Sequence, residues 1–151
     1  MMNTVAESIF GTAKDPEQMS ISMDSWDKLQ ALNENCVLYE QNDGGNLISW
    51  IVVMPTTKDL MHKFLNKEIN EQQLLDQTKA QDKYSALYLC SGITLPDYRR
   101  QGHALKLFLD VIKRMPLTGD YQLFAWPTTP EGKKLADRIF QEIGKTILIR
   151  Q

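Results

Sequence analysis

The segment from Leu95 to Leu107 constrains the fold of this chain more than any other part of its sequence. It follows the almost unbroken apolar run from Ala86 to Cys90, which is typical of a strand covered on both faces. Pro96 and Asp97 end the strand, because proline lacks a ladder donor and Asp favours turns. A helix is expected to begin around Gln101 to His103. The segment therefore predicts a strand, a tight turn and a helix in direct succession.

The start of this helix has the features of an anion-binding turn. The first N–H groups of a helix are unpaired and carry partial positive charge, so they can hold a phosphate or pyrophosphate. Gly102 lets the backbone approach a ligand closely. Arg99 and Arg100 add formal charge, and His103 could add another donor. The apolar residues downstream recur at the spacing of one buried helical face: Leu105, Phe108, Leu109, Ile112 and Met115. Spacing alone leaves a solvated surface corner as an open alternative.

The turn also carries a family pattern. Arg99-Arg100-Gln101-Gly102-His103-Ala104 matches Arg/Gln-x-x-Gly-x-Gly/Ala, and it follows a Pro-x-Tyr turn. In this order after a strand, the segment resembles the GNAT superfamily of N-acetyltransferases, closely over about 30 residues and elsewhere as a compatible succession of elements. In that family the amides of the turn cradle the pyrophosphate of acetyl-coenzyme A. The resemblance therefore implies that acetyl-coenzyme A is a co-substrate bound by Arg99, Arg100, Gln101, Gly102, His103 and Ala104.

Composition and the order of elements indicate one domain over residues 1–151. A chain of 151 residues with 42% hydrophobic content can bury a substantial single core. We expect the α/β (α+β) class. The resemblance implies a central mixed, mostly antiparallel sheet, splayed at a V-shaped slot and flanked by helices on both faces. A formal charge of -2 and a pI near 5.7 give no general attraction to nucleic acid or to an anionic membrane.

The cysteines and histidines point to no metal site. Cys36 and Cys90 lie far apart in apolar runs, without Cys-x-x-Cys spacing or a histidine cluster, so both are expected to be buried free thiols. His62 is a lone histidine on a predicted helix. The N-terminus lacks a basic region followed by an apolar core, and no apolar run approaches the ~18 residues of a membrane span. We expect a cytoplasmic protein in a reducing compartment.

Helices are predicted in two parts of the first half. Two short ones are expected near the N-terminus, around Val5 to Phe10 and around Trp26 to Leu32. A helical pair is expected at about residues 58–79, and Asn70 with Gln73 forms a capping-box start for its second helix. Many GNAT relatives have only a short turn there. This insertion either packs on the sheet, which we favour, or covers the acceptor cleft.

A β-hairpin is predicted next to these helices. The runs Cys36 to Glu40 and Leu47 to Met54 are rich in strand-forming residues, and the turn residues Asn42 to Asn46 separate them. Pro55 is expected to end the second strand.

The central strand is predicted from Tyr84 to Leu95. Gly92 within it favours a β-bulge, with a simple bend as the alternative. In the resembling family, splayed strands open a slot in which the pantetheine arm pairs with free backbone groups. Gly92, Ile93 and Thr94 are therefore the candidates for that contact.

The last third of the chain predicts a strand, a helix, a stop and a strand. The first strand spans Tyr121 to Trp126, and Thr129-Pro130-Glu131 opens the helix in the order of cap, proline and acid. Gly144 ends the helix, and Thr146 to Ile149 forms the last strand. The expected buried face of the helix comprises Ala136, Ile139, Phe140 and Ile143.

The catalytic residues remain unassigned at this level. An alkyl amine has a pKa of about 10.4, so its attack on a thioester needs a base or a desolvating pocket. The family often uses a Glu near the central strands and a Tyr on the last helix, but Ala86 to Leu95 contains no acid and Lys133 to Ile143 contains no Tyr. Glu40 is a weak candidate base. A backbone N–H near Gly92 to Thr94 is the expected donor to the carbonyl oxygen. A covalent route through Cys90 is disfavoured, because no histidine is placed to activate it.

Two functions follow from this sequence. The first is an acetyl-CoA-dependent N-acyltransferase that moves an acetyl group to the primary amine of a small molecule or a protein. The second is a catalytically inactive GNAT-like module that binds coenzyme A or a partner protein. An unrelated nucleotide-binding module would need Gly-x-Gly-x-x-Gly, which the sequence lacks. No nucleic acid, membrane or metal is expected as a partner, and a homodimer is among the assemblies that the resemblance allows.

Overall fold

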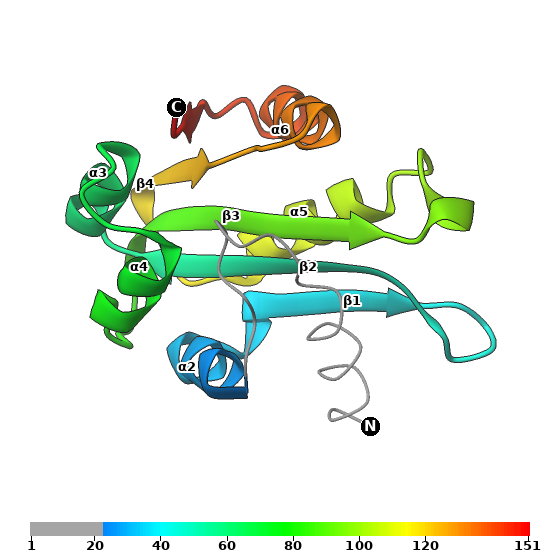
Figure 1. Ribbon diagram of the computed structural model, residues 1–151, viewed down its shortest axis with the longest axis horizontal. Coiled ribbons are helices and arrows are strands. Elements are labelled where there is room, and N and C mark those ends of the chain that lie inside the picture. Colours follow the sequence, from blue (N-terminus) through cyan, green and yellow to red (C-terminus); the bar gives the residue numbers. More distant parts are fainter. Residues whose placement is uncertain (1–22) are drawn as a thin grey trace.

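A five-stranded mixed sheet in the order β1-β2-β3-β4-β5 forms the centre of the molecule (Figure 1). The computed structural model describes residues 23–151. Antiparallel pairing joins β1 to β2 and β2 to β3, whereas β3, β4 and β5 run parallel. The longest ladder, between β2 and β3, is antiparallel, and the mixed sheet agrees with the predicted α+β class. The strands are β1 (Val37–Gln41), β2 (Leu47–Thr56), β3 (Tyr84–Thr94), β4 (Leu117–Ala125) and β5 (Ile147–Ile149).

The helices occupy the connections that the sequence predicts. The helical pair between β2 and β3 and the two helices of the last third are confirmed, and so is α2, the helix that precedes the β-hairpin. The predicted helix around Val5 to Phe10 lies outside the described residues. The α-helices are α2 (Met23–Leu32), α3 (Lys58–Leu65), α4 (Glu71–Gln77), α5 (His103–Arg114) and α6 (Pro130–Ile143), and the 3-10 turns are η1 (Glu34–Cys36) and η2 (Pro96–Tyr98).

Local capping explains where these helices begin and end. Asn70 and Gln73 form the reciprocal capping box of α4. The Thr129 side chain accepts a hydrogen bond from the N–H of Gly132 at the start of α6. Gly144 ends α6 with a φ of 74°, a left-handed conformation that favours glycine. These signals involve neighbouring residues only, and each was predicted from the sequence.

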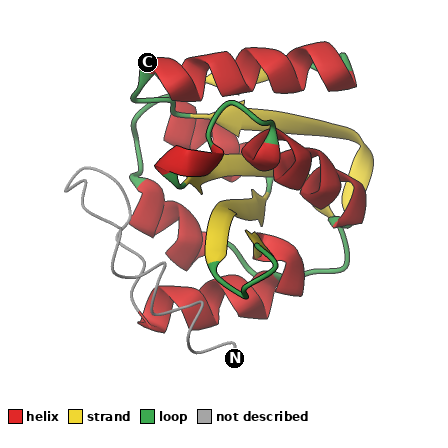
Figure 2. Cartoon of the chain, turned by 90° about the vertical axis from the view of Figure 1, so that its right-hand side faces the viewer, coloured by secondary structure: helices red, strands yellow, loops and turns green. Residues whose placement is uncertain are grey.

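Helices cover both faces of the sheet. The side chain of Phe64 from α3 packs against Tyr88 and Phe124, with ring centroids 4.8 and 5.9 Å away. On the opposite face, α5 lies behind β2 and β3 (Figure 1) and places Phe108 against the sheet. Figure 2 shows the sheet edge-on between these helices. Buried aromatic rings pack tightly on one face of the sheet, so β3 rests on a rigid base there.

The bulge in β3 is at Cys90, so its predicted position at Gly92 is wrong. Val52 pairs with Ser91 and Val53 pairs with Leu89, which leaves Cys90 as the extra residue. Gly92 stays in register and serves a different purpose. A Cβ atom at this position would lie 3.0 Å from Cε2 of Phe108, so glycine allows α5 to approach the strand closely.

Three other details differ from the sequence prediction. Pro55 lies inside β2 and does not end it. Among the described strands, β1 pairs with β2 only as far as Val52, so Pro55 needs no backbone N–H on that edge of the strand. Strand β4 begins at Leu117, where parallel pairing to Tyr84 extends it. Phe140 is 47% exposed rather than buried, since the inward side of α6 is set by Ile139.

β3 and β4 pair only part of the way along β3. Their parallel ladder runs from Tyr84 and Leu117 to Leu89 and Ala125. β4 then stops, because Pro127 cannot continue the ladder and α6 starts shortly after it. β3 continues to Thr94 on its antiparallel pairing to β2. From Cys90 onward, β3 therefore has no partner on its β4 side among the described strands.

We predict that Gly92→Ala lowers the free energy of unfolding by about 1 to 3 kcal/mol, because the added methyl group crowds the buried ring of Phe108. Urea denaturation measures this loss. Gly119→Ala in β4 is the matched control, since nothing lies within 4 Å of a Cβ atom there. The loss should shrink in a Phe108→Leu background. Equal stability of the two alanine variants would contradict the packing argument.

Candidate functional site

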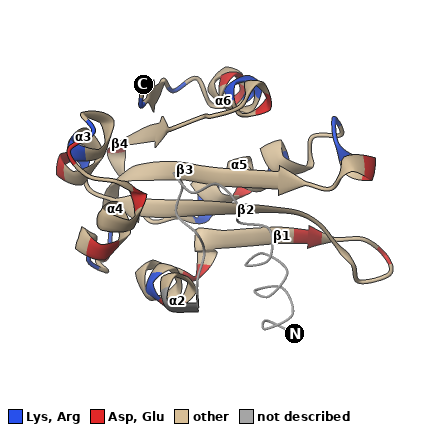
Figure 3. Cartoon of the chain, in the orientation of Figure 1, with Lys and Arg blue, Asp and Glu red and all other residues tan. Residues whose placement is uncertain are grey.

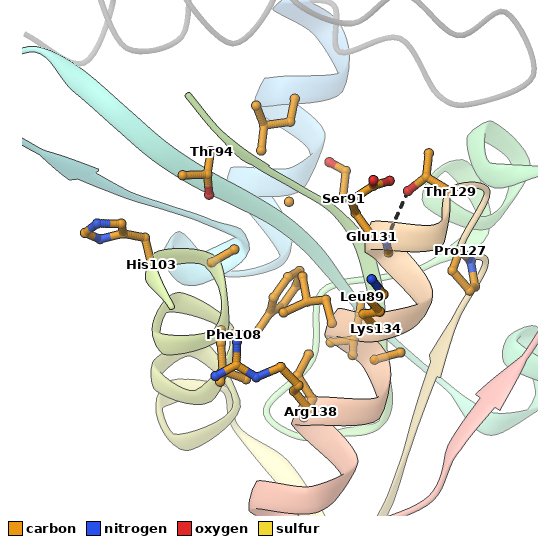
Figure 4. A pocket seen from close by; sticks show the side chains of 18 of the residues that line it. Leu89, Ser91, Thr94, His103, Phe108, Pro127, Thr129, Glu131, Lys134 and Arg138 are labelled. Atoms are coloured by element: carbon orange, nitrogen blue, oxygen red, sulfur yellow. Dashed lines mark hydrogen bonds between the residues drawn. The ribbon is translucent and has the colours of Figure 1, made fainter. Parts of the chain in front are cut away.

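A cleft of about 720 Å³ opens where β3 and β4 part. Its floor is the unpaired end of β3, and its walls are the first turns of α5 and one side of α6 (Figure 4). Leu89 and Ala125, the last paired residues of the two strands, lie at its base. The cleft therefore combines free backbone groups of a strand with the start of a helix.

The turn before α5 lines this cleft with Arg99, Arg100 and the first residues of the helix, Gly102 to Ala104. Gly102 is the N-cap of α5 with a φ of 82°, and within the described part of the chain no side chain caps the helix. Arg100 also has a positive φ, of 65°. Such left-handed residues turn successive N–H groups toward one side, which forms an anion-binding concavity. A Cβ atom at Gly102 would meet nothing within 4 Å, so a side chain added at this position would extend into open space.

Side-chain hydrogen bonds from the turn itself and from the hairpin hold this turn in place. Nε of Arg99 donates to the carbonyl of Thr94 at 3.0 Å, which closes the turn onto the end of β3. Asn42 Nδ2 donates to the Tyr98 hydroxyl at 3.1 Å. The Glu40 carboxylate lies 2.9 Å from Nδ1 of His103. These contacts join β1, its following turn and α5, so the amides are held in place before any ligand binds.

The cleft carries more basic than acidic side chains. Arg99 and Arg100 contribute from the turn, and Lys134 and Arg138 contribute from α6. Figure 3 shows basic and acidic residues together on the turn between β3 and α5 and on α6, and an acidic end on β1. Glu131 is the one acidic residue among the described residues that line the cleft. An anionic ligand is therefore favoured over most of the surface.

The structure brings most of the predicted coenzyme residues together. The described residues that line the cleft include Gly92, Ile93, Thr94, Arg99, Arg100, Gly102, His103 and Ala104. Gln101 is not one of them, and its side chain lies near the carbonyl of Asp97 and the ring of His103. Glu40 lies outside the cleft lining, against His103. Sequence reasoning missed Glu131, Lys134 and Arg138, although their i, i+3 and i+7 spacing on one helix was a usable signal.

Some backbone acceptors of β3 are already used by the protein. The Ser49 hydroxyl donates to the carbonyl of Ile93 at 3.1 Å and lies 2.9 Å from the Thr94 hydroxyl. Arg99 occupies the Thr94 carbonyl. Leu95 donates to the Ile48 carbonyl on β2, so Gly92 and Thr94 are the alternate residues that face away from β2. A ligand that pairs with this edge would therefore find its free partners at Gly92.

The two thiols are poor nucleophiles in the folded chain. Cys90 is half-buried and lines the cleft, so the prediction that both thiols are buried is wrong for Cys90, although desolvation raises its pKa well above the usual value of 9.0. Burial raises the pKa of Cys36 from 9.0 to about 12. A raised pKa keeps a thiol neutral at physiological pH, and the thiolate is the reactive form. The cleft therefore does not supply an activated cysteine.

Comparison with known proteins assigns no family to the chain. It matches none of the protein-family models, curated proteins or solved structures compared with it. Across residues 23–151, no three His, Cys, Asp or Glu side chains form a group able to hold a metal ion. Among the described helices, none has the length and apolar character needed to cross a membrane. The function is therefore inferred from the geometry and the charge of the cleft.

We predict that iodoacetamide labels Cys36 in the folded Cys90→Ser variant at least about a hundredfold more slowly at pH 8 than in the urea-unfolded chain. A pKa raised from 9.0 to about 12 lowers the thiolate fraction by roughly a thousandfold. The rate in the folded chain should keep rising about tenfold per pH unit above pH 9, where the rate in the unfolded chain levels off. Mass spectrometry of labelled protein measures both rates, and equal rates in the two states would contradict the burial argument.

Proposed function

We propose that this chain is a GNAT-like, acetyl-CoA-dependent N-acyltransferase that moves an acetyl group from the thioester to a primary amine. The main support for this proposal is that two structural features meet in one cleft. The free edge of β3 from Cys90 to Thr94 meets the uncapped amides at Gly102 to Ala104. A long ligand with an anionic end and an amide-containing arm suits both features.

The basic residues give this ligand an orientation. Its pyrophosphate would meet the amides of the α5 start and the Arg100 guanidinium, where the helix dipole and the formal charge act together. Lys134 and Arg138 would face further phosphate or polar groups from α6. The amide-containing arm would run along β3, toward the base of the cleft at Leu89 and Ala125.

After the coenzyme is bound in position, the transfer step needs few further chemical groups from the protein. A coenzyme thiol resembles a cysteine thiol, with a pKa of about 8.5, so it can leave as a thiolate. A backbone N–H of the unpaired stretch near Gly92 would stabilise the carbonyl oxygen as it gains charge. Positioning the two reactants then supplies much of the rate enhancement.

The alternative function is an inactive GNAT-like module that binds coenzyme A or a partner protein. One observation favours it. Glu40, the weak candidate base of the hairpin, lies against His103 and not in the cleft lining. Release of free thiol from acetyl-CoA across a panel of amines separates the two functions. Coenzyme binding without transfer to any amine would favour the inactive module.

We predict that Gly102→Asp weakens acetyl-CoA binding by about tenfold or more, whereas Gly102→Asn changes it by less than about threefold. Both side chains tolerate the left-handed backbone of Gly102 and differ mainly in charge. Titration calorimetry measures the affinities. Because Gly102 has a φ of 82°, either side chain adds backbone strain, so the unfolding free energies of the two variants should fall by a similar amount.

Two results of this titration would overturn the proposal. If wild-type protein gives no heat with millimolar acetyl-CoA, both the enzyme and the inactive module are rejected. If the Asp and Asn variants bind acetyl-CoA equally well, the phosphates do not sit at the start of α5.

A further inference from the structure

One carboxylate interrupts the basic lining of the cleft. Glu131 is in the first turn of α6, and among the described cleft-lining residues it is the only acid. In Figure 4 its carboxylate points toward Ser91 and the Thr129 hydroxyl, whereas Arg138 extends away from it toward Phe108. The charge of the cleft is therefore divided, with one negative position near the open edge of β3.

Among the described residues, Glu131 has no ion-pair partner that would neutralise its charge. It forms no hydrogen bond or ion pair with any residue from 23 to 151, although Lys134 is only one turn further along α6. The cap bond from Gly132 N–H to Thr129 Oγ1, 3.0 Å long, fixes the first turn of α6 and hence the place of Glu131. An acid in a first helical turn also stabilises the helix dipole. Stabilising the helix dipole does not require the side chain to lie in the cleft, and it leaves the carboxylate oxygens available to a ligand.

We infer that Glu131 binds the ammonium group of the acetyl acceptor and removes its proton. This inference rests on the proposed function. An anionic thioester ligand is attracted to the arginines and repelled by Glu131, so its acyl end and not its phosphates belongs near this carboxylate. A primary alkylammonium has the opposite preference. The acceptor class is therefore a primary alkyl amine, carried either by a small polyamine or by a lysine of a peptide.

The transfer step balances with Glu131 as the base. The Glu131 carboxylate takes one proton from the ammonium group, and the nitrogen lone pair then forms a bond to the thioester carbonyl carbon. The C–S bond breaks, and its electron pair leaves with sulfur. The nitrogen gives its second proton to the thiolate as the amide forms, and Glu131 releases the first proton to solvent. The products are an amide, a free thiol and one proton.

The test compares wild-type protein with Glu131→Gln, Glu131→Asp and Glu142→Gln. Glu142 is an acid on the same helix that does not line this cleft, so its variant is the matched control. Acetyl-CoA binding is measured by calorimetry and stability by urea denaturation. Thiol release is measured with two acceptors, 1,4-diaminobutane and an N-terminally blocked peptide with one lysine.

For the acceptor that wild-type protein acetylates, Glu131→Gln should lower kcat/KM by about a hundredfold or more. Its affinity for acetyl-CoA should stay within about twofold, Glu142→Gln should resemble wild type, and Glu131→Asp should restore part of the rate. The acceptor that reacts identifies the source of the amine. A merely structural role would instead lower stability and coenzyme affinity together.

Three outcomes would overturn the inference. In the first, Glu131→Gln keeps its rate within about threefold, and the proposed acyltransferase stands without this base. In the second, wild-type protein binds acetyl-CoA but acetylates neither acceptor, which supports the inactive module. In the third, wild-type protein does not bind acetyl-CoA, and the proposed function fails together with the inference.

Discussion

The parting of β3 and β4 is the constraint on which the rest of this structure depends. Pro127 and the start of α6 end β4 at Ala125, while β2 supports β3 as far as Thr94. Backbone N–H and C=O groups need partners, so the stretch after Leu89 cannot be covered by apolar side chains without a large cost. The parallel ladder must therefore end in an open, polar-edged cleft, and every candidate functional residue is placed relative to that opening.

Packing on the two faces keeps the opening in a fixed shape. On one face Tyr88 is buried against Phe64 and Phe124, and its hydroxyl donates to Glu71. On the other face Gly92 lets Phe108 of α5 approach the strand. The start of α5 thereby comes to the free edge of β3, where braces from the hairpin hold it. Rigid packing thus supports a turn whose amides are not capped by any side chain in residues 23–151.

Local sequence signals predicted the elements well because each of them acts over a few residues. The Asn70 capping box, the Thr129 cap and the Gly144 stop are where they were expected. The errors concern features that depend on neighbouring strands and helices. The bulge at Cys90 is set by the pairing of β3 with β2. Pro55 is tolerated in β2 because, among the described strands, β1 does not extend as far as this residue. A glycine read as a bulge proved to be a packing position.

The sequence by itself determined that a strand, a tight turn and a helix follow one another around Gly102, because backbone preferences and periodicity are encoded within a few residues. It also indicated the residues of that turn as a phosphate site. Only the tertiary structure decided that Glu131 and Arg138 share the same cleft and that Glu40 lies against His103. Contacts of this kind depend on how the connections through α5 and α6 bring distant segments of the chain side by side. No local sequence pattern encodes that placement.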